Sequence, residues 1–419
     1  MTISTLLHRT GCIVRTIART RRSLLAGALF FYAGLATAQT LTTLYNLQGG
    51  SSDGNWPCGI IRDPAGNLYG EAQFGGPQNA GAIFELNTTN KETVLHMFKG
   101  PDGQAPCSSL LRLPSGDLYG TTIYGGDGEN GTVFRIHNGS LVASYKFLGG
   151  IDGQNPFSGL TENIDGALYG TTAGGGTGNT CPGGCGTVFK FDQSGHKTIV
   201  YNFHGADGAN PGGMLIHDAE GNLYGTTSVG GANQMCPQQG GCGTVFKLNP
   251  QGSLTVLYSF LGGTDGWDVQ NGVVRDTEGN LYGTTLGGGT ASFGTIFEIT
   301  HDGTEKVLYS FTGAPDGADP SQIVLHNSTL YGTTYTGGNY NCDGLTGGCG
   351  TVFQFDKEGR EQVLYRFSGS FDGAQPIGSV AIDSEGNIYG TTQSGVKDGC
   401  TPFPYGCGTV WKLAPASAQ

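Results

Sequence analysis

The stretch from Asn280 to Ile299 reads NLYGTTLGGGTASFGTIFEI and holds the pattern on which the rest of the chain is built. Two short runs of strand-forming residues, 280–285 and 294–299, stand on either side of a glycine-rich loop. The same pattern returns seven times along the chain. Repeats that stack on one another make one body, so this repetition overrides the two or three domains that 419 residues would otherwise suggest.

Each repeat contains four predicted strands. In the unit that includes the quoted stretch they are 272–275, 280–285, 294–299 and 306–311, which we call strands a, b, c and d. Short turns rich in Asp, Gly and Asn connect a to b and c to d. These residues favour hairpins because they tolerate positive φ angles. The d–a and b–c connections are longer and vary between units.

The strands are rich in Tyr and Phe and do not alternate apolar with polar side chains, so both faces of each sheet must be covered. Seven four-stranded units of about 50 residues that cover one another predict an all-β fold, a seven-bladed β-propeller of antiparallel blades. A β-helix would have much shorter repeats. Separate domains are disfavoured because a lone four-stranded sheet cannot bury two faces.

The two ends of the chain predict how the ring closes. Residues 41–47 form a lone strand d, whereas the last repeat ends with a strand c at 408–413 and lacks its own strand d. We therefore expect the strand at 41–47 to pair with the C-terminal blade and to close the ring.

Residues 1–38 are predicted to be a signal peptide that lies outside the folded domain. Five arginines precede an apolar run at 24–35, which is too short to span a bilayer comfortably, and residues 36–38 form an A-x-A cleavage site. Residues 20–25 also resemble a twin-arginine signal, and we favour a Sec signal because the usual Phe and Lys are missing. We expect residues 39–419 to form a single exported domain, periplasmic or extracellular.

The mature chain is strongly acidic. Loss of the five arginines of residues 1–38, which contain no acidic residue, takes the formal net charge from −12 to −17. Such a chain repels phosphate backbones, so we expect no nucleic-acid partner. The charge also suits a cation or a cationic ligand. No later apolar run is long enough for a membrane span, and we expect a monomer.

The repeated segments LYGTT and GTVF, linked by LYSF and DG, resemble the GloVer tandem repeat. This repeat occurs in exported bacterial proteins called choice-of-anchor tandem repeat GloVer-containing proteins. The resemblance covers residues 41–413 and implies an exported, propeller-like protein made of seven GloVer-type repeats. It implies no established activity and no catalytic residues.

Strand order places the d–a and b–c loops on one face of the propeller, the loop face, and the a–b and c–d turns on the other, the turn face. Long, variable loops on a rigid scaffold are where binding sites usually lie. The d–a loop carries an Asp-Gly in every unit, which gives seven candidate ligand-binding residues: Asp53, Asp102, Asp152, Asp207, Asp265, Asp316 and Asp372.

These aspartates have two interpretations. They could form a ring of carboxylates at the channel mouth that binds calcium or sugar hydroxyl groups. Alternatively, each could cap the backbone of its own loop in an Asx-type turn. We favour the turn, because a feature present in every unit usually serves the unit. The sequence predicts no other metal or cofactor.

Ten cysteines remain after Cys12 leaves with the signal peptide. Eight form close pairs in b–c loops, and an oxidising compartment favours disulfides over zinc sites because each pair lacks neighbouring histidine ligands. These pairs are Cys181/Cys185, Cys236/Cys242, Cys342/Cys349 and Cys400/Cys407. They are expected to stiffen loops and not to hold the ring together. Cys58 and Cys107 lie at matching places in the first two units and are either a bridge between inner strands or two buried thiols.

No catalytic constellation is visible. The histidines are scattered, and the glycine runs lack the Lys-Ser/Thr of a phosphate-binding loop. The sequence therefore favours a binding module for carbohydrate or another extracellular ligand, such as a protein. A glycan-processing hydrolase or lyase that uses loop-face carboxylates is the alternative, and a protein-interaction scaffold is a third. One fold supports all of these functions.

Overall fold

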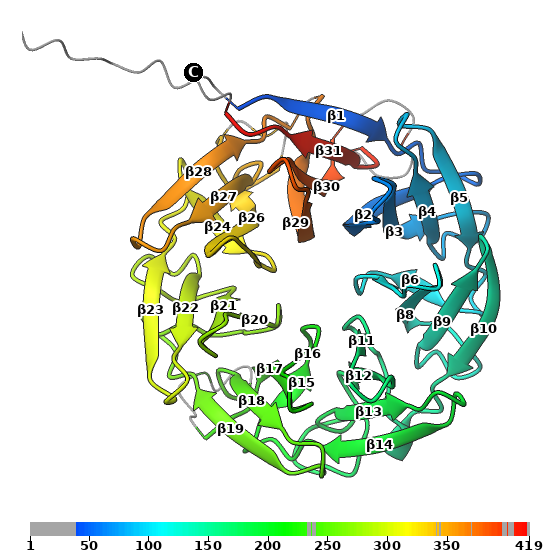
Figure 1. The fold of residues 1–419 in the computed structure, drawn as a ribbon, viewed down its shortest axis with the longest axis vertical. Coiled ribbons are helices and arrows are strands. Elements are labelled where there is room, and N and C mark those ends of the chain that lie inside the picture. Colours follow the sequence, from blue (N-terminus) through cyan, green and yellow to red (C-terminus); the bar gives the residue numbers. More distant parts are fainter. Residues whose placement is uncertain are drawn as a thin grey trace, which may run out of the picture. The chain divides into compact units, whose positions relative to one another are not determined.

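The computed structural model describes residues 39–416 except 233–235, 237–239, 341, 343–344, 370, 396–399 and 401–405. Its strands form seven antiparallel sheets that follow one another around an axis, so the predicted seven-bladed β-propeller is confirmed (Figure 1). The predicted signal peptide, 1–38, lies outside the described residues. Within the described residues, no helix is long and apolar enough to cross a membrane.

Within each blade, the strands are given below in their order from the axis outward. Blade 1 contains β2 (Gly54–Arg62), β3 (Leu68–Gly75), β4 (Ala82–Leu86) and β5 (Glu92–Met97). Blade 2 contains β6 (Gln104–Pro106), β7 (Leu111–Arg112), β8 (Leu118–Tyr124), β9 (Thr132–His137) and β10 (Ser140–Lys146). Blade 3 follows a 3-10 turn, η1 (Gly150–Asp152), and contains β11 (Thr161–Glu162), β12 (Leu168–Thr172), β13 (Thr187–Phe191) and β14 (Lys197–Asn202).

The other four blades repeat this plan. Blade 4 contains β15 (Ala209–Pro211), β16 (Ile216–His217), β17 (Leu223–Val229), β18 (Thr244–Leu248) and β19 (Leu254–Ser259). Blade 5 contains β20 (Val273–Arg275), β21 (Leu281–Thr285), β22 (Thr295–Ile299) and β23 (Glu305–Ser310). Blade 6 contains β24 (Gly317–Pro320), β25 (Val324–His326), β26 (Thr329–Gly337), β27 (Thr351–Phe355) and β28 (Glu361–Arg366). Blade 7 contains β29 (Ala374–Ile382), β30 (Ile388–Ser394), β31 (Thr409–Leu413) and β1 (Leu41–Asn46).

The ring closes as predicted. Strand β1 is the outermost strand of blade 7 and pairs antiparallel with β31, from Leu41 opposite Leu413 to Asn46 opposite Thr409 (Figure 1). One blade is thus shared between the two ends of the described chain, and no blade is left with an unpaired strand c.

Contacts within each blade explain why the GTT and GTxF segments recur in the sequence. In blade 5, the hydroxyl groups of Thr285 and Thr295 lie 2.9 Å apart across β21 and β22, and both side chains are buried. The glycine that precedes the threonine pair is required by the strand-c aromatic ring. A Cβ added at Gly283 would lie only 2.4 Å from Cζ of Phe297.

Aromatic rings connect each blade to the next. Phe260, at the end of strand d in blade 4, meets Phe297 of strand c in blade 5 edge-on, with ring centroids 5.0 Å apart. Edge-to-face pairs of this kind contribute about 0.5–1.5 kcal/mol beyond the burial of their area. Five further junctions repeat the contact: Phe98–Phe134, Phe147–Phe189, Phe203–Phe246, Phe311–Phe353 and Phe367–Trp411.

The blades are also joined on the loop face by a hydrogen bond and a proline contact. At the junction of blades 5 and 6, the backbone N–H of Asp319 donates to the carbonyl of Phe293 (3.1 Å). The next residue, Pro320, packs on Gly294, where a Cβ would lie 2.6 Å from the proline Cδ. The strand-c glycine is therefore needed for close approach of the neighbouring blade.

Candidate functional site

The seven loop-face aspartates bind groups of their own loops. In blade 3's d–a loop, for example, the hydroxyl of Tyr201 donates to Asp207 (2.6 Å) and the backbone N–H of His204 donates to the same carboxylate (2.8 Å). The other six aspartates likewise accept from a ring of the outermost strand and from a backbone N–H. The ring partner is a tyrosine for each of them except Asp102, which pairs with His96.

These hydrogen bonds are those expected if each aspartate caps the backbone of its own loop. Burial and the neighbouring aspartate raise the pKa of Tyr201, so its hydroxyl stays a donor at any ordinary pH. The carboxylates point at the outermost strands and are engaged there. Ligand binding by this ring of aspartates stays a prediction.

All five disulfides form, including the one that the sequence left open. Cys58 bridges to Cys107 and joins the inner strands of blades 1 and 2. The other four bridges are Cys181–Cys185, Cys236–Cys242, Cys342–Cys349 and Cys400–Cys407.

Each of the four loop bridges includes a residue that bonds to the next blade, a link that could not be foreseen from the sequence. The second cysteine of each pair offers its carbonyl to a backbone N–H of the next blade, as Cys242 does to Asp268 (3.1 Å). The same bond links Cys185 to Asn210, Cys349 to Gln375 and Cys407 to Trp56. By fixing its loop, each bridge holds an acceptor of the bond between blades.

The same backbone bond occurs at all seven blade junctions, and its donors form a ring of equivalent residues at the loop-face end of the inner strands. Each has a positive φ, between 51° and 64°, although none is glycine. The ring consists of Trp56, Ala105, Asn155, Asn210, Asp268, Asp319 and Gln375. We call these the mouth residues. Positive φ is costly for most side chains and is tolerated best by Asn and Asp. The backbone is the same in all seven blades while the side chains differ, so the mouth can be chemically asymmetric.

Below the mouth lies an axial cavity of about 380 Å³ that receives residues from every blade. Its lining includes Cys58, Ser109, Phe157, Met214, Asn271, Tyr335 and Ile377. Cavities of this size and composition, apolar with a few convergent polar groups, are typical of small-molecule sites. None of its lining residues is Lys, Arg or His.

One arc of the cavity and its mouth, in blades 6 and 7, is a hydrogen-bonded network. Asp319 accepts from the hydroxyl of Thr336 (2.7 Å). The hydroxyl of Tyr335 donates across the blade junction to Gln393 (3.1 Å). Burial, and then the charge of Asp319, raise the pKa of Tyr335, which keeps this hydroxyl protonated. In blade 7, Gln375 accepts from the hydroxyl of Ser394 (2.8 Å).

The opposite arc, in blades 1 to 3, is apolar and aromatic. The rings of Trp56 and Phe74 pack edge to face at 5.5 Å in blade 1. Phe157 of blade 3 lines the cavity and is 41% exposed. An apolar ring in the lining of a cavity offers a contact surface to a ligand.

Asp268, in blade 5, differs from the other acidic mouth residue. In blades 6 and 7 the strand-b residue paired with the residue before the mouth position, Thr336 or Ser394, supplies a hydroxyl partner, whereas Gly287 occupies this place in blade 5. The ring of Trp267 covers that glycine, where a Cβ would lie 2.1 Å from Cζ2. Burial alone raises the pKa of Asp268 to about 6, and no described residue donates a hydrogen bond or an ion pair to its carboxyl group.

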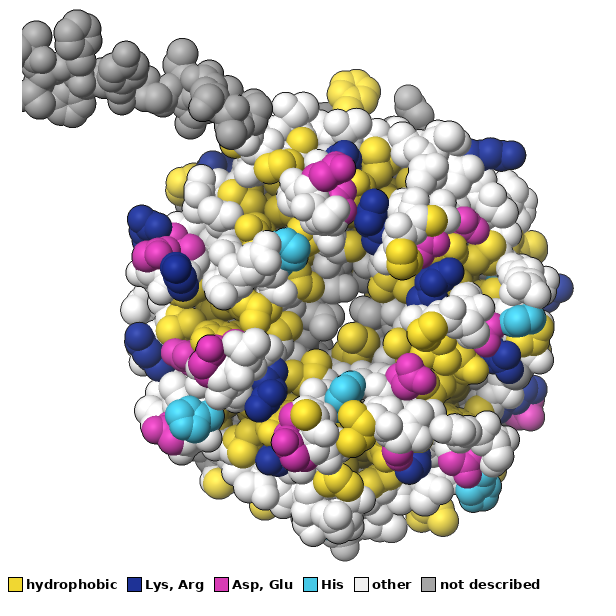
Figure 2. Space-filling view, in the orientation of Figure 1, with side chains coloured by type: hydrophobic (Ala, Val, Ile, Leu, Met, Phe, Trp, Pro, Cys, Tyr) yellow, Lys and Arg dark blue, Asp and Glu magenta, His cyan; other side chains and the backbone are white. Residues whose placement is uncertain are grey.

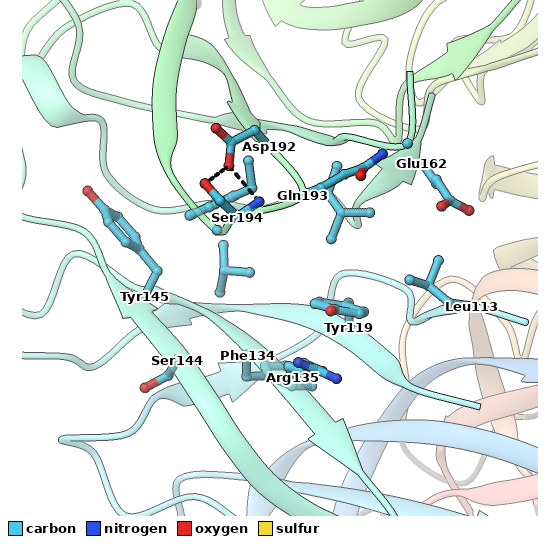
Figure 3. Close-up of a pocket in the computed structure, with 15 residues that line it drawn as sticks. Leu113, Tyr119, Phe134, Arg135, Ser144, Tyr145, Glu162, Asp192, Gln193 and Ser194 are labelled. Carbon is cyan, nitrogen blue, oxygen red and sulfur yellow. Dashed lines mark hydrogen bonds between the residues drawn. The ribbon is translucent and has the colours of Figure 1, made fainter. Parts of the chain in front are cut away.

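The turn face holds pockets that the sequence analysis missed, because each is built from two repeats. One of about 630 Å³ lies between blades 2 and 3. Tyr119 and Arg135 form one side of it, and the turn containing Asp192 faces them (Figure 3). Asp117 holds the Arg135 guanidinium (2.8 Å), and Asp192 accepts from its own turn at Ser194 (2.6 Å). A similar pocket of about 860 Å³ lies between blades 5 and 6.

Glu71 is a second group that the sequence analysis overlooked. It replaces the first threonine of the YGTT pattern in blade 1 and is fully buried. It accepts from the backbone N–H groups of Ser108 (2.7 Å) and Ser109 (2.8 Å) in blade 2. Burial raises its pKa to about 7 although these bonds lower it. The break in the repeat was a visible signal, and the residue supports the cavity wall at Ser109.

No metal centre is apparent among the described residues, since no three His, Cys, Asp or Glu side chains there are grouped to hold an ion. Charged side chains of both signs are interspersed with apolar ones on the face of the ring seen in Figure 2.

The repeats match a known family model. The model is described as the Gloeobacter/Verrucomicrobia repeat, and it covers residues 4–237 and 235–419. The chain belongs to this family. No curated protein matches the chain significantly.

Solved structures similar to this member of the Gloeobacter/Verrucomicrobia repeat family share its fold at low sequence identity. A streptogramin B lyase is 16% identical with a TM-score of 0.58, and the match covers 90% of this chain and 98% of the lyase. The extracellular domain of a putative one-component system from B. thetaiotaomicron is 13% identical with a TM-score of 0.56, over 91% of this chain and 42% of that one. At these identities the likeness establishes the propeller and no activity.

Proposed function

We propose that this protein is an exported binding module whose axial cavity takes a carbohydrate from the loop face. The observation that supports this function best is the two-sided character of the cavity and its mouth. Hydrogen-bonding side chains of blades 6 and 7 stand opposite an exposed aromatic ring of blade 3. A sugar ring has hydroxyl groups around its edge and apolar C–H groups on its faces, so it needs both kinds of contact.

The disulfides support the proposal that the protein is exported. Five bridges within one chain are typical of a protein from an oxidising, non-cytoplasmic environment. We propose the periplasm or the cell exterior as the finer location, reached through the predicted signal peptide at 1–38.

The test is a glycan-array screen of residues 39–419, followed by calorimetry on any glycan that binds. Phe157→Ser is the informative variant, because Ser321 occupies the equivalent position in blade 6 and the fold accommodates it there. We expect Phe157→Ser to weaken binding by about tenfold through loss of the apolar contact.

The control is Ile164→Ser, which removes a 60% exposed apolar side chain outside the cavity. Its affinity should equal that of the wild type. Equal affinity of all three proteins, or loss of binding only in the control, would reject the cavity as the site. A repeat of the screen in calcium and then in chelator tests whether a cation takes part.

A specific observation also favours an enzymatic alternative, a glycan-processing hydrolase or lyase. Asp268 and Asp319 are carboxyl groups at equivalent mouth positions of adjacent blades, and the pKa of Asp268 is raised to about 6, as a general acid requires. Cleavage of the bound glycan that is lost in Asp268→Asn would establish it, and an intact glycan after prolonged incubation would exclude it for that ligand.

A further inference from the structure

Asp268 is an acidic side chain whose carboxyl group receives no hydrogen bond or ion pair from any residue that the structure describes. Two of its counterparts show what a partnered mouth residue looks like, since Asp319 and Gln375 each accept from a hydroxyl of strand b. Blade 5 has Gly287 at the corresponding place. The space that a Thr or Ser side chain would use is occupied by the ring of Trp267, which offers no hydrogen bond through its face.

The surroundings of Asp268 do not neutralise it either. The next mouth residue along the ring is Asp319, another carboxyl group, and the cavity below contains no Lys, Arg or His in its lining. Leu286, whose backbone N–H donates to the backbone carbonyl of Asp268, is a neutral residue of the cavity lining. A partly buried carboxylate without a counter-charge is unfavourable, and pairing it with a cation relieves that cost.

We infer that the cavity selects a sugar carrying a free primary ammonium group, which pairs with Asp268 at the mouth. The inference rests on the proposed function, and it specifies the ligand of that site. An ammonium group gives three N–H donors and a positive charge, so it matches Asp268. Asp319 is a second carboxyl group, at the next mouth position. A hydroxyl or an N-acetyl group supplies a donor without charge, and a uronic acid brings like charge to the mouth.

The net charge of the domain acts in the same direction. The formal net charge of residues 39–419 is −17, which raises the local concentration of cations and speeds their encounter with the protein. The charge of the whole chain favours any cation, whereas Asp268 confers selection at one position. The experiment has to separate these two effects.

The experiment is calorimetry at pH 7 and moderate salt with three disaccharides: β-1,4-linked glucosamine, its N-acetylated form and cellobiose. We expect the wild type to bind the glucosamine disaccharide at least about tenfold more tightly than the other two. In Asp268→Asn this preference should disappear. The variant should fold, because Asn155 and Asn210 occupy the equivalent positions of blades 3 and 4 with the same backbone geometry.

The matched control is Asp127→Asn. Asp127 lies in the b–c loop of blade 2, is 71% exposed at its side chain and pairs with Lys146 outside the cavity. This variant changes the net charge by the same amount, so it should keep the full preference. Loss of the preference in both variants would assign it to long-range attraction and overturn the role of Asp268.

The remaining outcomes separate the inference from the function on which it rests. Equal affinity for the three disaccharides would leave the carbohydrate site standing and refute the charge selection. If no disaccharide binds but spermidine or calcium does, in a manner that depends on Asp268, the cation site stands and the carbohydrate ligand is refuted. Absence of binding by the disaccharides, spermidine and calcium would refute both.

Discussion

Replacement of Asp268 by Asn should make the folded protein more stable at pH 8 and leave its stability nearly unchanged at pH 4. The reason is that burial raises the pKa of this carboxyl group to about 6, above the value of about 3.9 in an unfolded chain. For an acid shifted in this direction, folding carries no penalty below the unfolded pKa. The penalty grows as the pH rises through the folded pKa and is complete above it.

The magnitude follows from the two pKa values. A difference of about two units corresponds to roughly 3 kcal/mol of unfolding free energy at pH 8. The side chain is partly exposed, so solvent screening reduces this figure, and we expect about 1–3 kcal/mol. With an unfolding entropy of roughly 2 cal/mol/K per residue, this shifts the melting temperature of a domain of this size upward by about 1–4 °C.

The assay is thermal and urea unfolding of residues 39–419, wild type and variant, at pH 4 and pH 8. The comparison variant is Asp319→Asn, whose carboxylate already has the Thr336 hydroxyl as a partner and should give no stabilisation. An Asp268→Asn variant that is less stable than the wild type at pH 8, or equally stabilised at both pH values, would refute the reasoning. Functional sites often carry groups that lower stability, so a gain in stability in Asp268→Asn would support a functional role for Asp268.

Three further outcomes are expected, all measurable on the same protein. Deletion of residues 39–48 removes β1 and exposes the outer edge of blade 7, so the melting temperature should fall sharply; an unchanged value would contradict closure of the ring by this strand. Lys197→Ala should destabilise by about 3–5 kcal/mol in urea, because the side chain of Lys197 is 5% exposed and its ammonium group pairs with Asp152 across the junction of blades 2 and 3 (2.7 Å). A loss below about 1 kcal/mol would contradict this expectation. Every cysteine of residues 39–419 should resist alkylation until a reductant is added, and a labelled pair at Cys58 and Cys107 would show that the bridge between blades 1 and 2 does not form.

The sequence predicted the architecture well because the repeat encodes it locally. Gly283, Thr285 and Phe297 each perform the same packing task in their blade that their counterparts perform elsewhere, so seven copies give one signal seven times. The end of the chain at 408–413 without a strand d was enough to predict its pairing with the strand at 41–47.

The candidate site was harder to predict from the sequence, for the opposite reason. Function in a symmetric ring depends on where the copies differ, and such differences acquire meaning only beside their spatial neighbours. Asp268 is notable because Gly287 stands where blades 6 and 7 carry a hydroxyl partner, and because the ring of Trp267 fills the space beside that glycine. Neither relation follows from sequence distance. The pocket between blades 2 and 3 needs side chains of two repeats at once, which no single unit reveals.

The shared blade imposes an order on biosynthesis. Strand β1 leaves the ribosome long before its partner β31, so its edge has no native strand to pair with while six complete blades are produced. Contacts between segments so distant in the chain form late and slow the final step of folding. The protein therefore stays an open arc, with exposed edges that invite aggregation, until its last strand is available. Any pause in translation or export before β31 would leave a species in need of a chaperone.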